Sequence, residues 1–246
     1  MRFILTLLCL IFTSISPAFA NLNAIKMDVS IRELDSWKSQ IATYTNSYDE
    51  ILREIYKKPS KLDDKLPLLR SYYPRTRQYS PFSKDILDEI TQHALILDTA
   101  SDNQVINEAL HSYKTLINKH LMNFDVASFA LTMSRIDVRF GDEIFYKRVR
   151  DALIKNIYRE GMGKTPETAH RIVSYGEETY ILDQIGGKID HSEIFEINGI
   201  YYNVHELTTK DGVYRQVFMN VTEPIKNIFY TQIIKEREEN VSLSPQ

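Results

Sequence analysis

Glycine is confined to the second part of this chain, because all eight glycines lie at Gly141 or later. Tight hairpins between strands usually need a residue at positive φ, and glycine is the residue that adopts it most readily. A long glycine-free stretch therefore disfavours a β-rich fold and favours helices joined by short polar or proline-containing turns. We predict that residues 21–160 form a helical region.

Apolar residues recur at three- and four-residue spacing along several segments of this region. The clearest helix is expected from Asp102 to Leu121, with Ser101 or Asp102 as the candidate N-cap. Further helices are predicted over 28–57, over 84–97, from Val126 to Met133 and from Phe145 to Ile157, and an irregular connector with three prolines over 61–83. The order of these segments predicts successive helical hairpins with a partial likeness to a tetratricopeptide hairpin.

After Gly161 the apolar period changes to alternation. We predict a short strand over 171–175, a helix over 177–184, strands over 194–197, 200–208 and 213–221, and a final helix over 225–237 that lies across one face of the sheet. Asn198-Gly199 between alternating runs is a strong hairpin signal. The expected fold is α+β: N-terminal helical hairpins, then a small antiparallel β-meander with flanking helices in an α+β region over 161–240, and a polar tail over 241–246.

The first twenty residues have the pattern of a secretory signal peptide. Arg2 precedes an apolar core, and Ala18 and Ala20 form a small-x-small cleavage site. The only cysteine, Cys9, lies within this leader, so the mature chain is predicted to contain no thiol, no disulfide and no thiolate metal ligand. We expect a protein exported to the periplasm or the extracellular medium.

Charge and composition exclude several classes of partner. The formal net charge is −3, and removal of Arg2 with the leader takes it to −4. No basic block stands free of acidic residues, so nucleic acid is not an expected partner. No second apolar segment is long enough to span a bilayer. The six histidines show no close ligand spacing, so we predict no metal and no cofactor.

The candidate catalytic residues are His170, Glu177, Glu178 and Tyr180. Adjacent carboxylates on a helix point about 100° apart, so they rarely share one proton, and two acids in a first helical turn also complement the helix dipole. No G-x-S-x-G motif indicates a serine nucleophile. The alternative function that this group supports is a metal-independent hydrolase with Glu177 or Glu178 as base and His170 nearby.

The candidate ligand-binding residues are Gly161, Gly163, Lys164 and Thr168. Gly-Met-Gly-Lys-Thr over 161–165 has a partial likeness to a phosphate-binding loop. Tyr158 occupies the position of the first glycine of that motif, and the preceding segment has a helical rather than a strand pattern. We therefore interpret this run as a flexible helix stop rather than a nucleotide site.

From Leu68 onward the chain resembles the domain-of-unknown-function 4919 family of exported bacterial proteins. The likeness is carried by Tyr79-Ser80-Pro81, Asn123-Phe124-Asp125, Phe140-Gly141-Asp142 and, most of all, the run from Gly161 to Leu182. The chain departs from the family pattern at Met162, where we expect aspartate, and at Thr179, which precedes Tyr180. The resemblance implies export and a common fold over about the last two thirds of the chain, and no known reaction.

These observations favour an exported binding or structural module in which residues 161–180 line a cleft between the helices and the sheet. Its partner is expected to be a small ligand or an envelope protein. A further alternative makes the helical half a docking surface for that partner. The discriminating observation is whether His170, Glu177, Glu178 and Tyr180 converge in one pocket.

Overall fold

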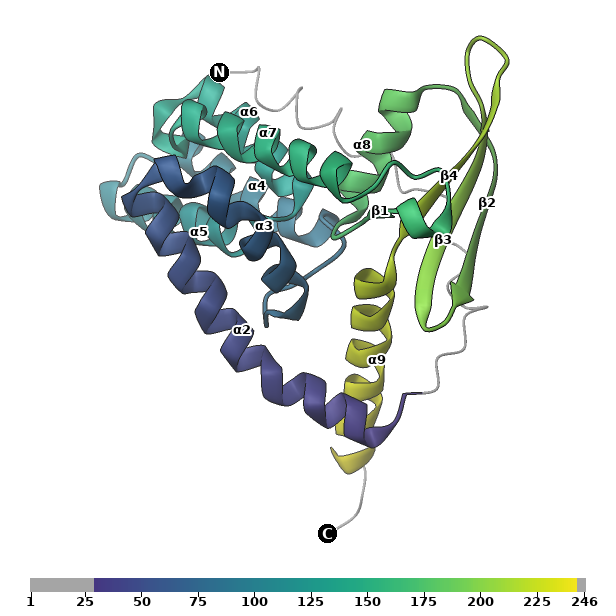
Figure 1. Cartoon of the computed structure of the whole chain (residues 1–246). Coiled ribbons are helices and arrows are strands. Elements are labelled where there is room, and N and C mark those ends of the chain that lie inside the picture. Colours follow the sequence, from purple (N-terminus) through teal and green to yellow (C-terminus); the bar gives the residue numbers. More distant parts are fainter. Residues whose placement is uncertain (1–28, 243–246) are drawn as a thin grey trace.

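The structure is a computed structural model that describes residues 29–242. A body of helices is followed by a four-stranded sheet with flanking helices (Figure 1). The predicted α+β class, with helical hairpins before the sheet, is confirmed. The predicted leader over 1–20 and the last four residues of the predicted tail lie outside the described residues.

The helical body is built from antiparallel pairs. Helices α4 and α5 pack against each other, as do α6 and α7, and α2 packs against α3. The side chains of Ser30, Asp102, Asn123 and Asp142 cap the helices that follow them by accepting backbone N–H bonds. The bounds are α2 Ile31–Lys57, α3 Leu62–Tyr72, α4 Lys84–Thr99, α5 Asn103–Lys119, α6 Phe124–Ile136 and α7 Glu143–Glu160, with 3₁₀ turns η2 Pro59–Lys61, η3 Tyr73–Arg75 and η4 Val138–Phe140.

The predicted irregular connector over 61–83 is wrong, because it contains helix α3 with Pro67 inside it. A proline within a helix costs about 3 kcal/mol through its missing N–H and its ring. Leu62, Leu66 and Leu69 all face the core and are at most 1% exposed. Burial of each leucine is worth about 1.5–3 kcal/mol, so the apolar face outweighs the proline.

The sheet has the order β1-β4-β3-β2. Its strands are β1 His170–Arg171, β2 Lys188–Ile197, β3 Ile200–Thr208 and β4 Tyr214–Asn220. β1 is parallel to β4, and the other pairs are antiparallel, as the meander prediction requires. Asn198 and Gly199 both have positive φ, at 53° and 77°, which is the geometry of the predicted hairpin turn.

Several helices and strands begin or end at other residues than predicted. The short strand ends at Arg171, and helix α8, Tyr175–Ile185, begins two residues before the predicted start, after the 3₁₀ turn η5, Pro166–Thr168. β2 begins at Lys188 rather than at residue 194, with an irregularity between Ile189 and His191. Such a bulge interrupts the alternation of side chains, so the apolar pattern does not show the first half of the strand.

Helix α9, Thr222–Ser242, does not lie across the sheet as expected. Its first turn packs against β3, and the helix then runs away from the sheet toward the N-terminal part of α2 (Figure 1). There the rings of Trp37 and Tyr230 meet edge to face at 5.2 Å between centroids.

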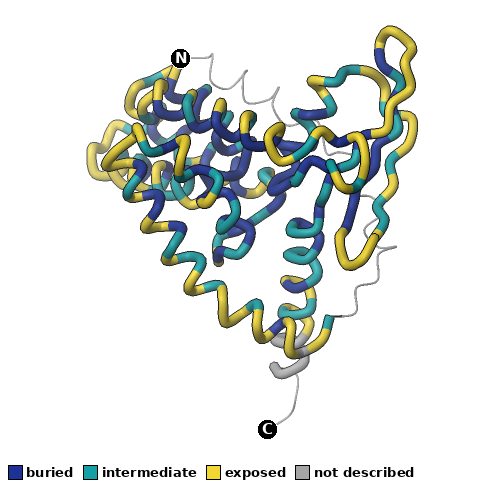
Figure 2. Tube along the Cα trace, viewed as in Figure 1, coloured by how far each residue is buried: buried dark blue, intermediate teal, exposed yellow. Residues whose placement is uncertain are grey.

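One hydrophobic core joins the helical body to the inner face of the sheet (Figure 2). It extends from Tyr48 of α2 to Ile225 of α9 and includes Leu207, Val217 and Met219 from the strands. The change in secondary structure near residue 160 therefore does not interrupt the core.

Candidate functional site

A cavity of about 730 Å³ opens where the end of α7, the segment after it, helix α8 and strand β4 meet. Its wall combines apolar side chains with two cations and a histidine. The lining residues are Tyr158, Met162, Gly163, Lys164, His170, Ile181, Ile185, Tyr214, Arg215, Gln216 and Val217.

The segment over 161–168 is a tight loop held by its own backbone. The amides of Met162 and Gly163 both donate to the Thr168 carbonyl, at 2.9 and 2.7 Å. Gly163 has a φ of +68°, and a Cβ at this position would lie 2.7 Å from His170 Cδ2. Glycine is thus required both by the backbone conformation and by the close approach of the imidazole.

His170 lies at the inner wall of this cavity and is 3% exposed. Its ring packs edge to face against Tyr158, with 5.6 Å between centroids. Burial lowers the pKa of His170, and a backbone interaction with Ile157 partly offsets this effect. Its Nδ1 is buried and makes no hydrogen bond of regular geometry among the described residues, and the Cδ2–Nε2 side of the ring faces Gly163.

The cavity is lined by two cations although the chain is acidic overall, and the carboxylates of Asp211 and Glu206 lie near its Arg215 side. Lys164 and Arg215 are both exposed on its rim, and neither forms an ion pair with a described residue. No carboxylate lines the wall among the described residues. The arrangement is suited to a ligand that carries a negative charge.

Glu177 is placed elsewhere, in a buried ion pair with Arg70. Arg70 Nε and Nη2 donate to the two oxygens of Glu177 at 3.1 and 2.8 Å, in the bidentate geometry that arginine forms with carboxylates. The guanidinium also donates to the side chain of Glu160 at 2.6 Å and to the carbonyl of Arg171 at 2.6 Å. The pair joins α3, α7, β1 and α8, and its role is to hold these elements together.

Glu178 faces the sheet instead, in a second buried polar group. Its Oε1 accepts from Asn203 Nδ2 at 3.2 Å and lies 3.2 Å from His205 Nε2, although the latter contact does not meet the angular criteria of a hydrogen bond. On the other side of the ring, His205 Nδ1 lies 2.7 Å from Ser192 Oγ. Glu178 and His205 are fully buried and Ser192 is half-buried.

The predicted site residues therefore separate into two groups. Gly163, Lys164 and His170 line the cavity, while Gly161 and Thr168 shape the loop behind it. Glu177 and Glu178 do not line it, and Tyr180 packs against Phe124 with 4.9 Å between ring centroids. The four candidate catalytic residues do not converge in one pocket.

The sequence interpretation missed the other wall of the cavity, which consists of four consecutive strand residues from Tyr214 to Val217 and two helical isoleucines, Ile181 and Ile185. The spacing of the two isoleucines at i and i+4 marks one face of α8. Nothing local in the sequence indicates that this face meets β4. His205 of β3 is also fully buried, and Glu178 of α8 contacts it there.

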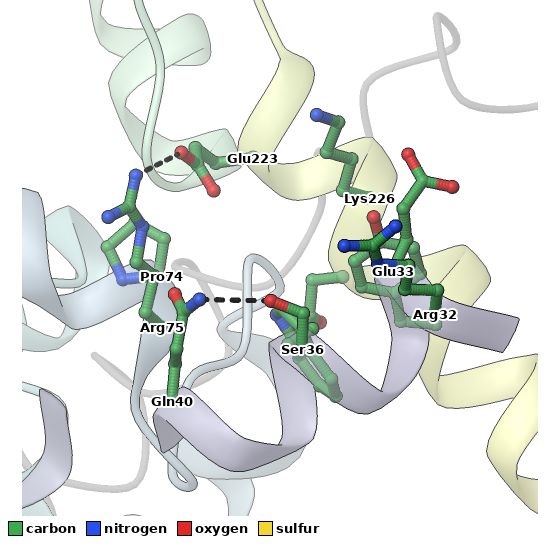
Figure 3. A pocket seen from close by; sticks show the side chains of 11 residues that line it. Arg32, Glu33, Ser36, Gln40, Pro74, Arg75, Glu223 and Lys226 are labelled. Atoms are coloured by element: carbon green, nitrogen blue, oxygen red, sulfur yellow. Dashed lines mark hydrogen bonds and ion pairs between the residues drawn. The ribbon is translucent and has the colours of Figure 1, made fainter. Parts of the chain in front are cut away.

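A smaller cavity of about 430 Å³ lies between α2, η3 and α9 (Figure 3). Its two carboxylates, Glu33 and Glu223, already engage neighbouring groups. Arg75 lies 3.7 Å from Glu223, and Glu33 accepts hydrogen bonds from Ser30 as part of the helix cap. Because its two carboxylates are engaged in this way, this cavity is the weaker candidate for a site.

Residues 29–242 contain no cluster of three or more histidine or carboxylate side chains arranged to hold a metal ion. Within the same residues, no helix is both long and apolar enough to cross a bilayer. Comparison with known proteins adds no assignment: no family model, no curated protein and no solved structure matches the chain.

Proposed function

We propose that the chain is an exported binding module that holds an organic anion in the cavity between α7, α8 and β4. The observation that carries this proposal is the combination of Lys164 and Arg215 with an apolar wall from Ile181, Ile185 and Val217, and with no lining carboxylate among the described residues. A volume of about 730 Å³ falls within the range of about 300–1,000 Å³ that small-molecule sites occupy. A ligand with a carboxylate and an apolar group would complement both the two cations and the apolar wall.

A paired series of ligands tests this function. Straight-chain carboxylates of increasing length and the primary alcohols of the same length are added to the purified protein, and binding is measured by calorimetry and by the shift in melting temperature. We expect carboxylates to bind more tightly than their alcohols, because only they gain from the two cations. At a ligand concentration of about one hundred times Kd, the stability gain is about 2.7 kcal/mol.

The controls are charge-neutral variants of similar size. Lys164→Gln and Arg215→Gln should each remove most of the difference between carboxylate and alcohol. Lys114→Gln, on the exposed surface of α5 away from the cavity, should leave it unchanged. Equal binding of carboxylates and alcohols, or no binding of either series, contradicts the proposal.

Export and family membership are part of the same proposal. They are supported by the pattern of Arg2, the apolar core and Ala18 to Ala20, and by the run from Gly161 to Leu182. The mass of the protein isolated from the producing cell should correspond to a chain that begins at Asn21. An intact Met1 in the mature protein would contradict the export proposal.

We propose a second candidate function, hydrolysis of a small ester at Ser192, because the half-buried Ser192, the buried His205 and the buried Glu178 follow one another in space. A nucleophile within hydrogen-bond distance of a base that is itself next to a carboxylate is a recurring arrangement for acyl transfer. Ser192 Oγ would add to the ester carbonyl as its proton passes to His205 Nδ1, which returns the proton to the departing alkoxide. Water would then release the acid from the acyl-serine by the same route. Ser192 lines neither of the two cavities described above, so ligand binding is the leading proposal.

An alkyl fluorophosphonate tests this second function, because it labels activated serines covalently. Labelling that is lost in Ser192→Ala and kept in Ser71→Ala would support hydrolysis. An unlabelled wild-type protein, by intact mass, would reject it.

A further inference from the structure

The cavity lies against the edge of strand β4 rather than against one face of the sheet. Side chains of successive strand residues point to opposite faces, so a cavity on one face touches every second residue. Here four consecutive residues from Tyr214 to Val217 line the cavity. A cavity that meets all four lies beside the strand, where the backbone groups point outward.

The register of the sheet identifies those backbone groups. On this side of β4, Phe218 N donates to the Gly163 carbonyl at 2.8 Å, and the Asn220 carbonyl accepts from Ile172 N at 2.9 Å. In an antiparallel ladder the N–H and C=O of alternate residues point to the same neighbour, so those of Gln216 and Tyr214 point in the same direction as those of Phe218 and Asn220. Strand β1 pairs only with Met219 and Asn220, and no other described strand covers this edge.

We propose that this edge binds the C-terminal end of an extended peptide, which adds a short strand beside Tyr214–Val217. The inference rests on the proposed function and names the class of its ligand. Addition of a strand to an exposed sheet edge is a general mode of peptide recognition, in which backbone bonds give affinity and neighbouring pockets select side chains. The free edge is about 13 Å long at about 3.3 Å per residue, enough for about four peptide residues.

The loop over 161–168 sets the direction of the bound peptide relative to β4. Gly163 occupies the edge at Phe218, so an added strand has to stop there, and Lys164 is the next residue of the loop. A terminal carboxylate at this point gains the charge of Lys164. The peptide then runs parallel to β4, with an upstream acidic side chain near Arg215 and apolar side chains against Ile181 and Ile185.

The test uses the full mature chain and a fluorescein-labelled pentapeptide of alternating valine and glutamate. Its affinity is measured by fluorescence polarisation with a free C-terminal carboxylate and with a C-terminal amide. We expect the amide to bind about tenfold more weakly, because it loses one charge-assisted contact. Lys164→Gln should weaken the free acid by a similar factor and leave the amide unchanged, and Lys114→Gln should affect neither.

N-methylation of successive peptide residues tests the added strand itself. Only alternate N–H groups of a paired strand face its neighbour, so affinity should fall about tenfold at every second position and stay within about twofold at the positions between. This alternation does not depend on the exact register of the peptide.

The outcomes separate the two proposals. If simple carboxylates bind but the peptide binds no more tightly and N-methylation has no alternating effect, strand addition is wrong and the proposed function stands. If neither carboxylates nor peptides bind, both are wrong. A concentration-dependent dimer that the peptide does not dissociate, in sedimentation experiments, would assign the edge to a second copy of the chain and overturn the inference.

Discussion

The guanidinium of Arg70 is buried and donates hydrogen bonds to the carboxylates of Glu160 and Glu177 and to the carbonyl of Arg171. It is 1% exposed and its partner Glu177 is 0% exposed. A buried pair adds little net stability over an apolar substitute, but removal of one partner leaves the other charge buried and unpaired. Loss of Arg70 is therefore expected to destabilise the protein mainly because it leaves the Glu177 carboxylate buried and unpaired.

Replacement of Arg70 by methionine should lower the free energy of unfolding by about 3–5 kcal/mol, measured by urea denaturation. The double variant Arg70→Met with Glu177→Gln should lose less than the sum of the two single variants, because the stranded charge is gone. Lys147→Met, which breaks an exposed pair with Asp151, should cost no more than about 1 kcal/mol. Additive losses at Arg70 and Glu177 would contradict the coupling.

His120 makes stability depend on pH. It is 8% exposed, its Nδ1 lies 3.1 Å from the Tyr73 hydroxyl, and burial, with a smaller contribution from Lys119, lowers its pKa to about 4. The unfolded chain, with a pKa of about 6.5, binds this proton more readily than the folded protein does. The contribution is therefore fully present above about pH 6.5 and is lost as the pH falls toward 4.

Between pH 7 and pH 4.5 the His120 contribution should fall by about 2–3 kcal/mol. Urea denaturation at the two pH values should show a correspondingly smaller pH dependence in His120→Gln than in the wild type. His111→Gln, on the exposed surface of α5, serves as the control and should keep the wild-type dependence. An unchanged dependence in His120→Gln would show that folding does not lower the pKa of His120.

At the scale of elements, the loop over 161–168 connects the helical body to the sheet and forms one wall of the cavity. Its backbone bonds to Thr168 and the positive φ of Gly163 set its shape. Gly212, in the turn before β4, also has positive φ, at 79°, but a Cβ there would meet nothing within 4 Å. Substitution at Gly212 therefore tests backbone strain alone, whereas substitution at Gly163 tests backbone strain together with a steric clash.

Gly212→Ala should cost about 1 kcal/mol of stability, the cost of a left-handed conformation for alanine. Gly163→Ala should cost about 1–3 kcal/mol more, because its methyl group also has to displace His170. Urea denaturation gives both values, and the NMR signals of the His170 ring should shift only in Gly163→Ala. If the two variants lose equal free energy of unfolding, the close contact between Gly163 and His170 contributes nothing to the cost of the substitution.

At the scale of the whole molecule, the core is continuous and the tip formed by α2 and α9 is peripheral to it. Trp37 and Tyr230 contact each other at this tip, and neither belongs to the main core cluster. Regions with few buried apolar contacts open at lower free energy than the core. The tip should therefore separate before the rest of the molecule unfolds.

Trp37 is the only tryptophan, so its fluorescence reports on the tip. Its transition in urea should have a lower midpoint than the far-ultraviolet circular dichroism of the helices. Tyr230→Ala should lower the fluorescence midpoint further and leave the circular dichroism midpoint nearly unchanged. Coincident transitions in both proteins would mean that the tip unfolds with the core.

The local features of this protein follow from its amino-acid sequence. Periodic apolar residues after Asp102 and the glycine-free first part predict helices, and Asn198-Gly199 predicts a hairpin, because caps and turns depend on a few neighbouring residues. Two of the predicted ligand-binding residues, Gly163 and Lys164, and one candidate catalytic residue, His170, line one cavity, although the loop alone does not show what faces them.

The residues that lie opposite them depend on how remote segments of the chain pack together. Helix α3 forms despite Pro67 because distant helices bury its leucines. Arg70 pairs with Glu177, which is more than one hundred residues away in the chain. His205 is buried beside Glu178 of α8, and the free edge of β4 exists because β1 ends after two residues. Burial, ion pairing and cavity shape depend on contacts between remote segments, and local patterns of residues do not encode them.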